Sequence, residues 1–328
     1  MDDDELKVDA VFEGGGVKGI GLVGAVSMTE ESGYRFENVA GTSAGAIVAS
    51  FIAAGYSSAE IKTILDGLDY LKFKDMGFND RIPLIGPAIS LIFEKGIYEG
   101  DYVENWLREN LSTRGVHTFG DLVVEAHKDD PKYRYRLQVI AADVSRGRML
   151  VLPKDINHYG IRPDDLEVAR AVRMSSSIPF FFEPVRLKQE TGETSFIVDG
   201  GLLSNFPVWI FDDGTADPPW PTFGYQLVEP GEGRPKVIKG PLTLLAALFS
   251  TMMEAHDARY IDDHSFARTI RIPTMEVQAT DYDITKEQSE RLYESGRKAA
   301  HEFLKAWDFE RYKANYRRKE PQPRRERV

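Results

Sequence analysis

The sequence predicts an α/β fold built on a central, mostly parallel sheet, because two strand–turn–helix units follow each other near its N-terminus. In the first unit, the β-prone run 7–12 stops at three glycines and leads into a helix of small and apolar residues over 17–28. In the second, a short strand over 36–40 passes through the turn 41–45 into an alanine-rich helix that ends at Gly55. Strands and helices in alternation are typical of α/β layers.

Further elements of both kinds follow along the chain. Ser57 and Glu60 form a capping box, which predicts the start of another helix. We expect strands over 135–142, 196–198, 222–228 and 268–272, and helices over 101–111, 164–174, 242–260 and 286–307. The sequence has no internal repeat and no glycine/serine-rich linker, so one domain over residues 1–308 is the simplest organisation.

The composition limits the class of protein. Of the 328 residues 42% are apolar, enough for a sizeable core, and no run of about 18 uncharged apolar residues predicts a membrane span. The lack of cysteine excludes disulfides, thiolate nucleophiles and cysteine-based metal sites. Residues 2–5 are acidic, unlike a signal peptide, so we expect a cytoplasmic protein. The net charge of −11 argues against nucleic acid as a partner.

Residues 309–328 differ from the rest of the chain in charge. Between 311 and 328, eight residues are basic and two are acidic, and Pro321 and Pro323 disfavour a helix. We therefore expect a disordered basic tail without packed structure. It is either a solvated extension or a polybasic segment that contacts anionic lipid, where each cation contributes about 1 kcal/mol.

An apolar stretch over 72–97, interrupted by Pro83 and Pro87, has two interpretations. It is either ordinary core or an inserted cap over an acyl channel, with part of its surface against a membrane. The three phenylalanines at 180–182 are candidates for the lining of such a channel. The leucine-rich stripe over 242–252 has helical spacing, which is more typical of core than of an interface.

The segment around Ser43 predicts a nucleophile elbow. A serine at a strand-to-helix turn has a strained backbone, and small neighbours let the turn close: Gly41, Thr42, Ala44 and Gly45. The hydroxyl then projects from the sheet edge, where the N-terminus of the following helix favours developing negative charge. The alternative is a tight glycine-rich turn without catalytic meaning.

The glycine-rich segment 14–19 also has two interpretations. Its glycines fit a dinucleotide-binding fingerprint, but that site needs an acidic residue at the end of the second strand. Glu37 stands at the start of that strand, and the serine turn follows its end. We favour an oxyanion hole made of backbone N–H groups. Adjacent parallel strands would bring both turns together at the carboxyl edge of the sheet.

A serine nucleophile needs a proton acceptor. A surface or structural role is the better interpretation for each of the six histidines, with His256 and His264 the least safe to dismiss. Asp199 is the better candidate, because it follows the apolar strand 196–198 and precedes two glycines. The alternative is a turn-forming Asp-Gly pair. A carboxylate serves as the base only where burial raises its pKa towards the working pH.

In combination, four segments resemble the patatin-like phospholipase family over residues 8–304. The family's oxyanion loop matches Gly14, Gly15, Gly16, Val17, Lys18 and Gly19. Its serine motif matches 41–45, and its aspartate motif matches Asp199, Gly200 and Gly201. A fourth segment, normally alanine- and serine-rich and ending in Ile-Pro, matches 175–179. The four in this order are highly specific. The departures are Met174, where a small residue is common, and Gly201, where some members have alanine.

The resemblance implies a patatin-like three-layer α/β/α fold and hydrolysis of lipid acyl esters by a Ser–Asp dyad, without a cofactor or metal. Ser43 is then the nucleophile and Asp199 the general base. The N–H groups of Gly15, Gly16 and Val17 are the implied oxyanion donors. The implied substrates are phospholipids, lysophospholipids or neutral lipids, and the apolar stretch and basic tail suggest peripheral membrane contact.

Two other functions stay open at this point. One is an acyltransferase or a Ser–His–Asp hydrolase with His256, His264 or His301 as the base, which separate replacement of Asp199 and each histidine would reveal. The other is a lipid- or nucleotide-binding module without catalysis. For that module, Ser43→Ala would leave ligand binding intact and a fluorophosphonate would form no adduct.

Overall fold

The computed structural model describes most of the chain. The described residues are 6–68, 100–189, 192–230, 263–277 and 283–318, with positions 238, 240, 244, 247, 248, 251, 252 and 279. Their strands are β1 (Leu6–Phe12), β2 (Tyr34–Thr42), β3 (Leu137–Asp143), β4 (Arg148–Leu152), β5 (Val185–Lys188), β6 (Thr194–Asp199), β7 (Thr222–Val228) and β8 (Thr269–Pro273). Their helices are α1 (Gly19–Glu31), α2 (Ala44–Ala53), α3 (Ser58–Asp66), α5 (Asp101–Ser112), α6 (Val168–Ser175), α8 (Asp263–Phe266), α9 (Lys286–Ala306) and α10 (Phe309–Tyr312).

These strands form one mixed sheet in the order β5-β6-β3-β2-β1-β7-β8, with β4 paired to β3. The five strands from β3 to β8 in this order are parallel to their neighbours. The pairs that involve β4, β5 and β6 are antiparallel. The predicted α/β class with a mostly parallel central sheet is confirmed, and β1 and β2 are adjacent and parallel as the two turns require.

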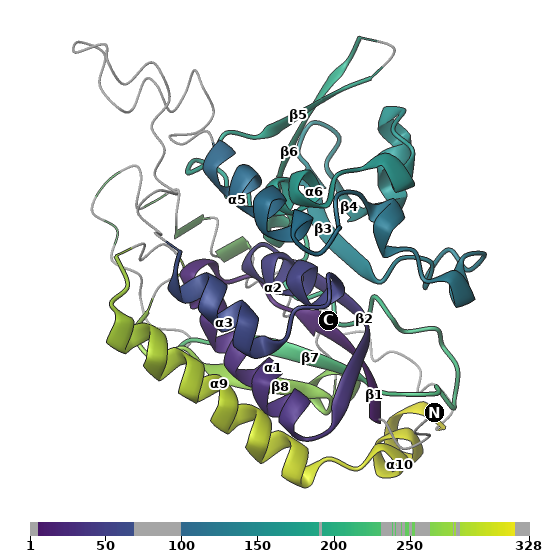
Figure 1. Cartoon of the computed structure of the whole chain (residues 1–328), viewed down its shortest axis with the longest axis vertical. Coiled ribbons are helices and arrows are strands. Elements are labelled where there is room, and N and C mark those ends of the chain that lie inside the picture. The colour runs from purple at the N-terminus through teal and green to yellow at the C-terminus, as the bar shows by residue number, and fades with distance from the viewer. Residues whose placement is uncertain are drawn as a thin grey trace, which may run out of the picture.

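Helices cover one face of this sheet. α1, α3 and α9 lie side by side over its lower part in Figure 1, while α2 packs on β2 and α6 on β3. Their buried side chains join those of the strands in one large apolar core. In the described part of the chain, no helix is long and apolar enough to cross a membrane.

A smaller core covers the centre of the opposite face. Val11, Ala40 and Ile140 belong to it, whereas their neighbours in the strands belong to the larger core, as the alternation of a strand requires. The segment after β6 supplies the four apolar side chains that pack on them: Phe206, Val208, Ile210 and Phe211. Because strands β1, β2 and β3 are thus apolar on both faces, they are typical of a covered parallel sheet.

Several element boundaries differ from the sequence-based expectation. The helix expected over 164–174 begins only at Val168, because Pro163–Asp165 form a separate 3₁₀ turn. β4 and β5 were not expected; each is short, and β5 alternates apolar and charged residues. The expected helix over 242–260 lies largely outside the described residues, and the apolar stretch 72–97 lies outside them entirely.

The expected basic tail is packed over its first ten residues. After α10, residues Lys313–Arg317 form a turn of π-helix. Tyr312 is buried, and the guanidinium of Arg317 pairs with Asp212. The prediction of a tail without packed structure from residue 309 is therefore wrong for 309–318, where aromatic and ionic contacts hold the chain. Residues 319–328 lie outside the described part.

Candidate active site

Strand register brings the ends of β2 and β6 together. β4 occupies one edge of β3 along residues 139–143, so β2 and β6 share the other edge. On that edge Thr42 faces Ile140 and Asp199 faces Ala141, the next residue of β3. Because β2 runs parallel to β3 and β6 antiparallel, the two strands meet end to end. Ser43, which follows Thr42, therefore lies beside Asp199.

Ser43 has the strained backbone expected of a nucleophile elbow. Its φ of 53° and ψ of −123° are unusual for a residue with a side chain, and α2 begins at the next residue. The close packing of the turn requires glycine on both sides. A Cβ at Gly41 would lie 2.3 Å from the carbonyl of Gly45, and one at Gly45 would lie 2.3 Å from the carbonyl oxygen of Phe12.

The Ser43 backbone N–H does not face the pocket. It donates a 2.9 Å hydrogen bond to the hydroxyl of Ser175, which in turn donates to the carbonyl oxygen of Ile140 at 2.5 Å. The side chain of Ser175 thus ties the backbone of Ser43 to β3. The sequence had placed Ser175 in a motif, without a role for its hydroxyl.

Asp199 is a buried carboxylate that contacts Gly201 and Ser43. Its side chain is 1% exposed and accepts a 2.8 Å hydrogen bond from the N–H of Gly201. The side chain of Ser43 also interacts with this carboxylate and favours its ionised form. Burial raises the pKa of Asp199 from 3.8 to about 7, and the contacts with Gly201 and Ser43 partly oppose this rise. A carboxylate with this pKa exchanges a proton near neutral pH.

The glycine-rich loop runs from the end of β1 to α1, next to Ser43. The N–H of Gly14 donates to the carbonyl of Asn205 at 3.2 Å, and the N–H of Val17 donates to the carbonyl of Ala279 at 3.1 Å. The prediction of Val17 as an oxyanion donor is therefore wrong for this conformation. Gly15 and Gly16 remain, since the described structure records no acceptor for their N–H groups.

Three buried side chains fix the shape of this loop. The ammonium of Lys18 pairs with Glu229 at 2.8 Å. Asn205 Nδ2 donates to the carbonyl of Gly14 at 3.2 Å and to the carboxylate of Glu13 at 3.4 Å. Glu13 also accepts a hydrogen bond from the backbone of Leu227 in β7. Sequence reasoning missed Asn205 and Glu13, because neither belongs to a local motif.

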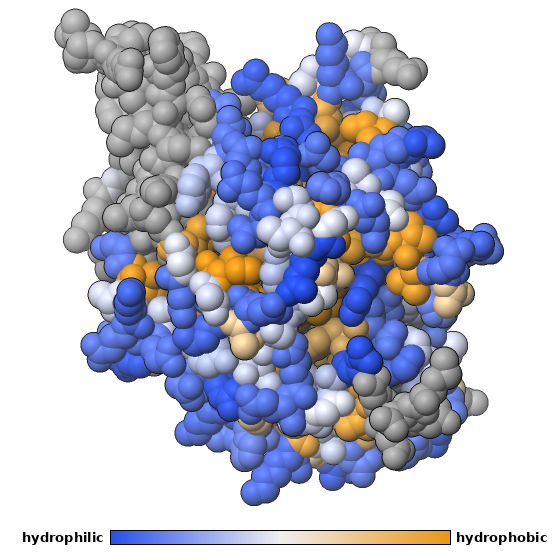
Figure 2. Space-filling view, in the orientation of Figure 1, coloured by the Kyte–Doolittle hydropathy of each residue, from blue (hydrophilic) through white to orange (hydrophobic). Residues whose placement is uncertain are grey.

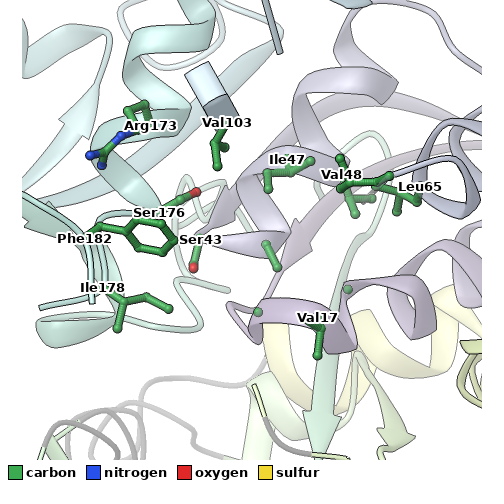
Figure 3. Close-up of a pocket in the computed structure, with 14 residues that line it drawn as sticks. Val17, Ser43, Ile47, Val48, Leu65, Val103, Arg173, Ser176, Ile178 and Phe182 are labelled. Atoms are coloured by element: carbon green, nitrogen blue, oxygen red, sulfur yellow. The ribbon is translucent and has the colours of Figure 1, made fainter. Parts of the chain in front are cut away.

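A pocket opens on Ser43 from the helical side of the sheet (Figure 3). Its walls are mainly apolar: Val17, Ala44, Ile47, Val48, Leu65, Leu68, Val103, Ile178 and Phe182. Of the three phenylalanines at 180–182, Phe182 alone is among the described lining residues. Figure 2 shows apolar side chains gathered between α3 and α5, the helices that carry Leu65 and Val103. An alkyl chain fits such a lining.

The histidines of the described chain do not line this pocket. The ring of His264 contacts the hydroxyl of Tyr312 at 2.7 Å, and His301 is exposed on α9. His256 lies outside the described residues. In the described part of the site, Asp199 is thus the titratable group that contacts the Ser43 hydroxyl.

The family model of patatin-like phospholipases matches residues 10–212, from β1 to beyond the aspartate motif. The chain belongs to the patatin-like phospholipase family. Among relatives of this family member, YqhO, an uncharacterized protein of Bacillus subtilis (strain 168), is 43% identical over 305 residues, which cover 93% of this chain and 100% of YqhO. The cGAMP-activated phospholipase of Escherichia coli (strain TW11681) is 26% identical over 213 residues, covering 61% of this chain and 53% of that protein.

A solved structure shares the fold of this patatin-like protein. VipD from Legionella pneumophila superposes with a TM-score of 0.55 at 19% sequence identity. The match covers 93% of this chain and 67% of VipD. At this identity the likeness bears on the fold alone.

Proposed function

We propose that this patatin-like protein hydrolyses acyl esters of lipids through a Ser43–Asp199 dyad. The observation that carries the proposal is the contact between the strained Ser43 and the buried Asp199, at the mouth of an apolar pocket. Family membership and the phospholipase relative support a lipid-hydrolysing enzyme.

The chemistry follows from the pKa of Asp199. In its ionised form the carboxylate accepts the proton as Ser43 Oγ attacks the ester carbonyl, and in its protonated form it returns that proton to the leaving alcohol. Water, deprotonated by Asp199, then releases the fatty acid from Ser43. A pKa of about 7 lets one carboxylate serve in both directions at neutral pH.

The negative charge that develops on the carbonyl oxygen has two sources of stabilisation in the proposal. The N–H groups of Gly15 and Gly16 are the oxyanion donors, and the N-terminus of α2 at Ser43 adds its partial positive charge. In serine proteases, the loss of one oxyanion donor costs about 3–4 kcal/mol of transition-state stabilisation.

The acyl chain of the substrate is proposed to lie in the pocket of Figure 3. Leu65, Leu68 and Val103 line it, and the apolar stretch 72–97 stands between them in the sequence. This supports the prediction of a cap over an acyl channel, which stays a prediction because the stretch lies outside the described residues. Because this apolar stretch stands beside the pocket-lining residues in the sequence, we also propose that the enzyme is cytoplasmic and contacts the membrane surface.

Hydrolysis of p-nitrophenyl esters of increasing chain length tests the proposal. We expect turnover that rises with chain length and is lost in Ser43→Ala and Asp199→Asn. The exposed variants Ser32→Ala and Asp217→Asn are matched controls and should behave as wild type. Mass spectrometry should locate a fluorophosphonate adduct on Ser43.

The outcomes separate the rival functions. Turnover that survives in Asp199→Asn would mean that a histidine is the base. Absence of both turnover and adduct in the wild type would favour a lipid- or nucleotide-binding module.

A further inference from the structure

Two serines beside the dyad have their hydroxyls engaged by the fold. Ser175 Oγ holds the backbone of Ser43, as described above. Ser177 Oγ donates to the carbonyl of Arg173 at 2.7 Å, and the carbonyl of Ser177 accepts the backbone N–H of Asp199 at 2.9 Å. The first serine thus positions the nucleophile and the third positions the base.

Ser176, between them, has a hydroxyl that the fold does not use. Its backbone N–H donates to the carbonyl of Val172 at 2.9 Å, and its carbonyl accepts from Ile178 at 2.9 Å. Its Oγ is buried and has no hydrogen-bond partner among the residues that the structure describes. A desolvated hydroxyl without a partner is unfavourable, so a bound molecule that supplies one gains affinity.

The position of Ser176 indicates which part of a substrate it meets. It lines the pocket together with Ser43, and Figure 3 shows both side chains at the end of the pocket near Phe182. An ester has three parts to accommodate. The apolar walls suit the acyl chain, and the glycine loop suits the carbonyl oxygen.

The third part of the ester is the alcohol-side oxygen, and few polar groups in the described lining can form a hydrogen bond with it. Beyond Ser43, the polar side chains there are Arg173 and Ser176. The guanidinium of Arg173 is engaged: it donates to the carbonyl of Glu183 at 2.9 Å and to the hydroxyl of Ser177.

We propose that Ser176 Oγ donates a hydrogen bond to the alcohol-side oxygen of the bound ester and stabilises the leaving alcohol. The inference rests on the proposed hydrolase function and adds a third polar side chain to the two of the dyad. In the acylation step, the bond between Ser43 Oγ and the carbonyl carbon forms and the bond from that carbon to the alcohol oxygen breaks. The proton of Ser43 passes through Asp199 to the alcohol oxygen, and Ser176 keeps its own proton.

This role predicts a dependence on the leaving group. A strongly basic alkoxide needs the hydrogen bond more than a weakly basic p-nitrophenolate does. A series of octanoate esters with p-nitrophenol, phenol, ethanol and glycerol as the alcohol therefore tests it. The quantity to measure is kcat/KM, because it includes no step after acylation.

For Ser176→Ala, we expect kcat/KM to fall about threefold with the p-nitrophenyl ester and by about tenfold or more with the ethyl and glyceryl esters. Because the comparison is made within one variant, the fraction of folded enzyme cancels. Ser32→Ala is the matched control. Ser176 is the C-cap of α6 and Ser32 is the C-cap of α1. Ser32 is exposed, however, and its hydroxyl donates to the carbonyl of Met28 in its own helix, so the variant should follow wild type.

Two results would overturn the inference while leaving the hydrolase intact. An equal loss with every alcohol would assign Ser176 a structural role. No loss at all would mean that water already satisfies its hydroxyl. A wild type that cleaves none of the esters and forms no fluorophosphonate adduct would overturn the proposed function, and the inference with it.

Discussion

The backbone N–H of Ser43 donates a 2.9 Å hydrogen bond to the hydroxyl of Ser175, a residue 132 positions later in the chain. Both groups are buried, and Ser175 relays the contact to β3 through Ile140. Ser175→Ala leaves two buried polar groups without this partner. We expect the free energy of unfolding to fall by about 1–3 kcal/mol.

The same variant should lower kcat/KM by about tenfold for every ester, since the position of the nucleophile is what changes. Urea unfolding and the octanoate ester series measure the two effects. A loss that depended on the alcohol would contradict the assignment and would point to direct contact of Ser175 with substrate.

The pH dependence of activity should report Asp199. Its pKa is raised to about 7, and its ionised form is the proposed base, so kcat/KM should rise with pH and reach a plateau above about pH 8. The profile is measured between about pH 5 and pH 9 with a p-nitrophenyl ester. A limb with a midpoint near the ordinary pKa of an aspartate would show that burial does not tune the base.

Asp199→Asn should make the protein inactive and, at high pH, more stable. The folded state raises the pKa of Asp199 above its unfolded value of 3.8, so the wild type loses stability as pH rises through about 7. The amide does not ionise. The stability difference between variant and wild type should therefore grow by on the order of 2–4 kcal/mol from about pH 4 to about pH 8.

Chemical denaturation at both pH values tests this prediction. Burial also raises the pKa of Asp9 to about 7, but Asp9 is present in both proteins, so its contribution cancels in the difference. A constant difference across the pH range would mean that Asp199 titrates alike in the folded and unfolded states.

Gly45→Ala should be far more damaging than Gly115→Ala. The new Cβ at position 45 would meet the carbonyl oxygen of Phe12 at 2.3 Å, and both are backbone-fixed. We expect a loss above about 3 kcal/mol, with loss of fluorophosphonate labelling. At Gly115 a Cβ meets nothing within 4 Å, so only its φ of +71° costs stability, about 1–2 kcal/mol. Similar losses at the two sites would contradict the steric argument.

The packed start of the basic tail predicts a large effect at Asp212. This carboxylate accepts two hydrogen bonds from the guanidinium of Arg268, at 2.8 and 2.5 Å, and also pairs with Arg317. Asp212→Ala leaves the buried Arg268 uncompensated, and we expect a loss of about 3–5 kcal/mol. Asp217→Ala removes an exposed partner of Lys313 and should cost less than about 1 kcal/mol. Differential scanning calorimetry compares the stability of the two variants with that of the wild type.

The parts of the site that could be predicted from the sequence are motifs of consecutive residues. The turn around Ser43 and the Asp199-Gly200-Gly201 segment each carry their own steric requirement for glycine. What sequence reasoning missed depends on distant pairing. Asn205 contacts the glycine loop from the segment after β6, and the N–H of Val17 donates to the carbonyl of Ala279, which follows β8. No motif in the sequence around Asn205 or Val17 indicates these contacts.

The fold shows the same division. Strands β1, β2, β3 and β7 are apolar runs bounded by turn residues, so their existence could be predicted. β4 and β5 are antiparallel strands at the side of the sheet, too short for a periodic signal. The helical start of the tail was missed because its charge suggested solvation, whereas Asp212 and Asp217 neutralise it locally.

The end-to-end meeting of β2 and β6 on one edge of β3 has a consequence for when the proposed dyad forms. Neighbouring strand residues face opposite sides of a sheet, so a slip of one residue between β6 and β3 would turn the Asp199 side chain away from Ser43. A growing chain that stops before β6 contains Ser43 but lacks Asp199. Under the proposed mechanism, ester cleavage therefore begins only after synthesis has passed β6 and this strand has paired with β3 in the observed register.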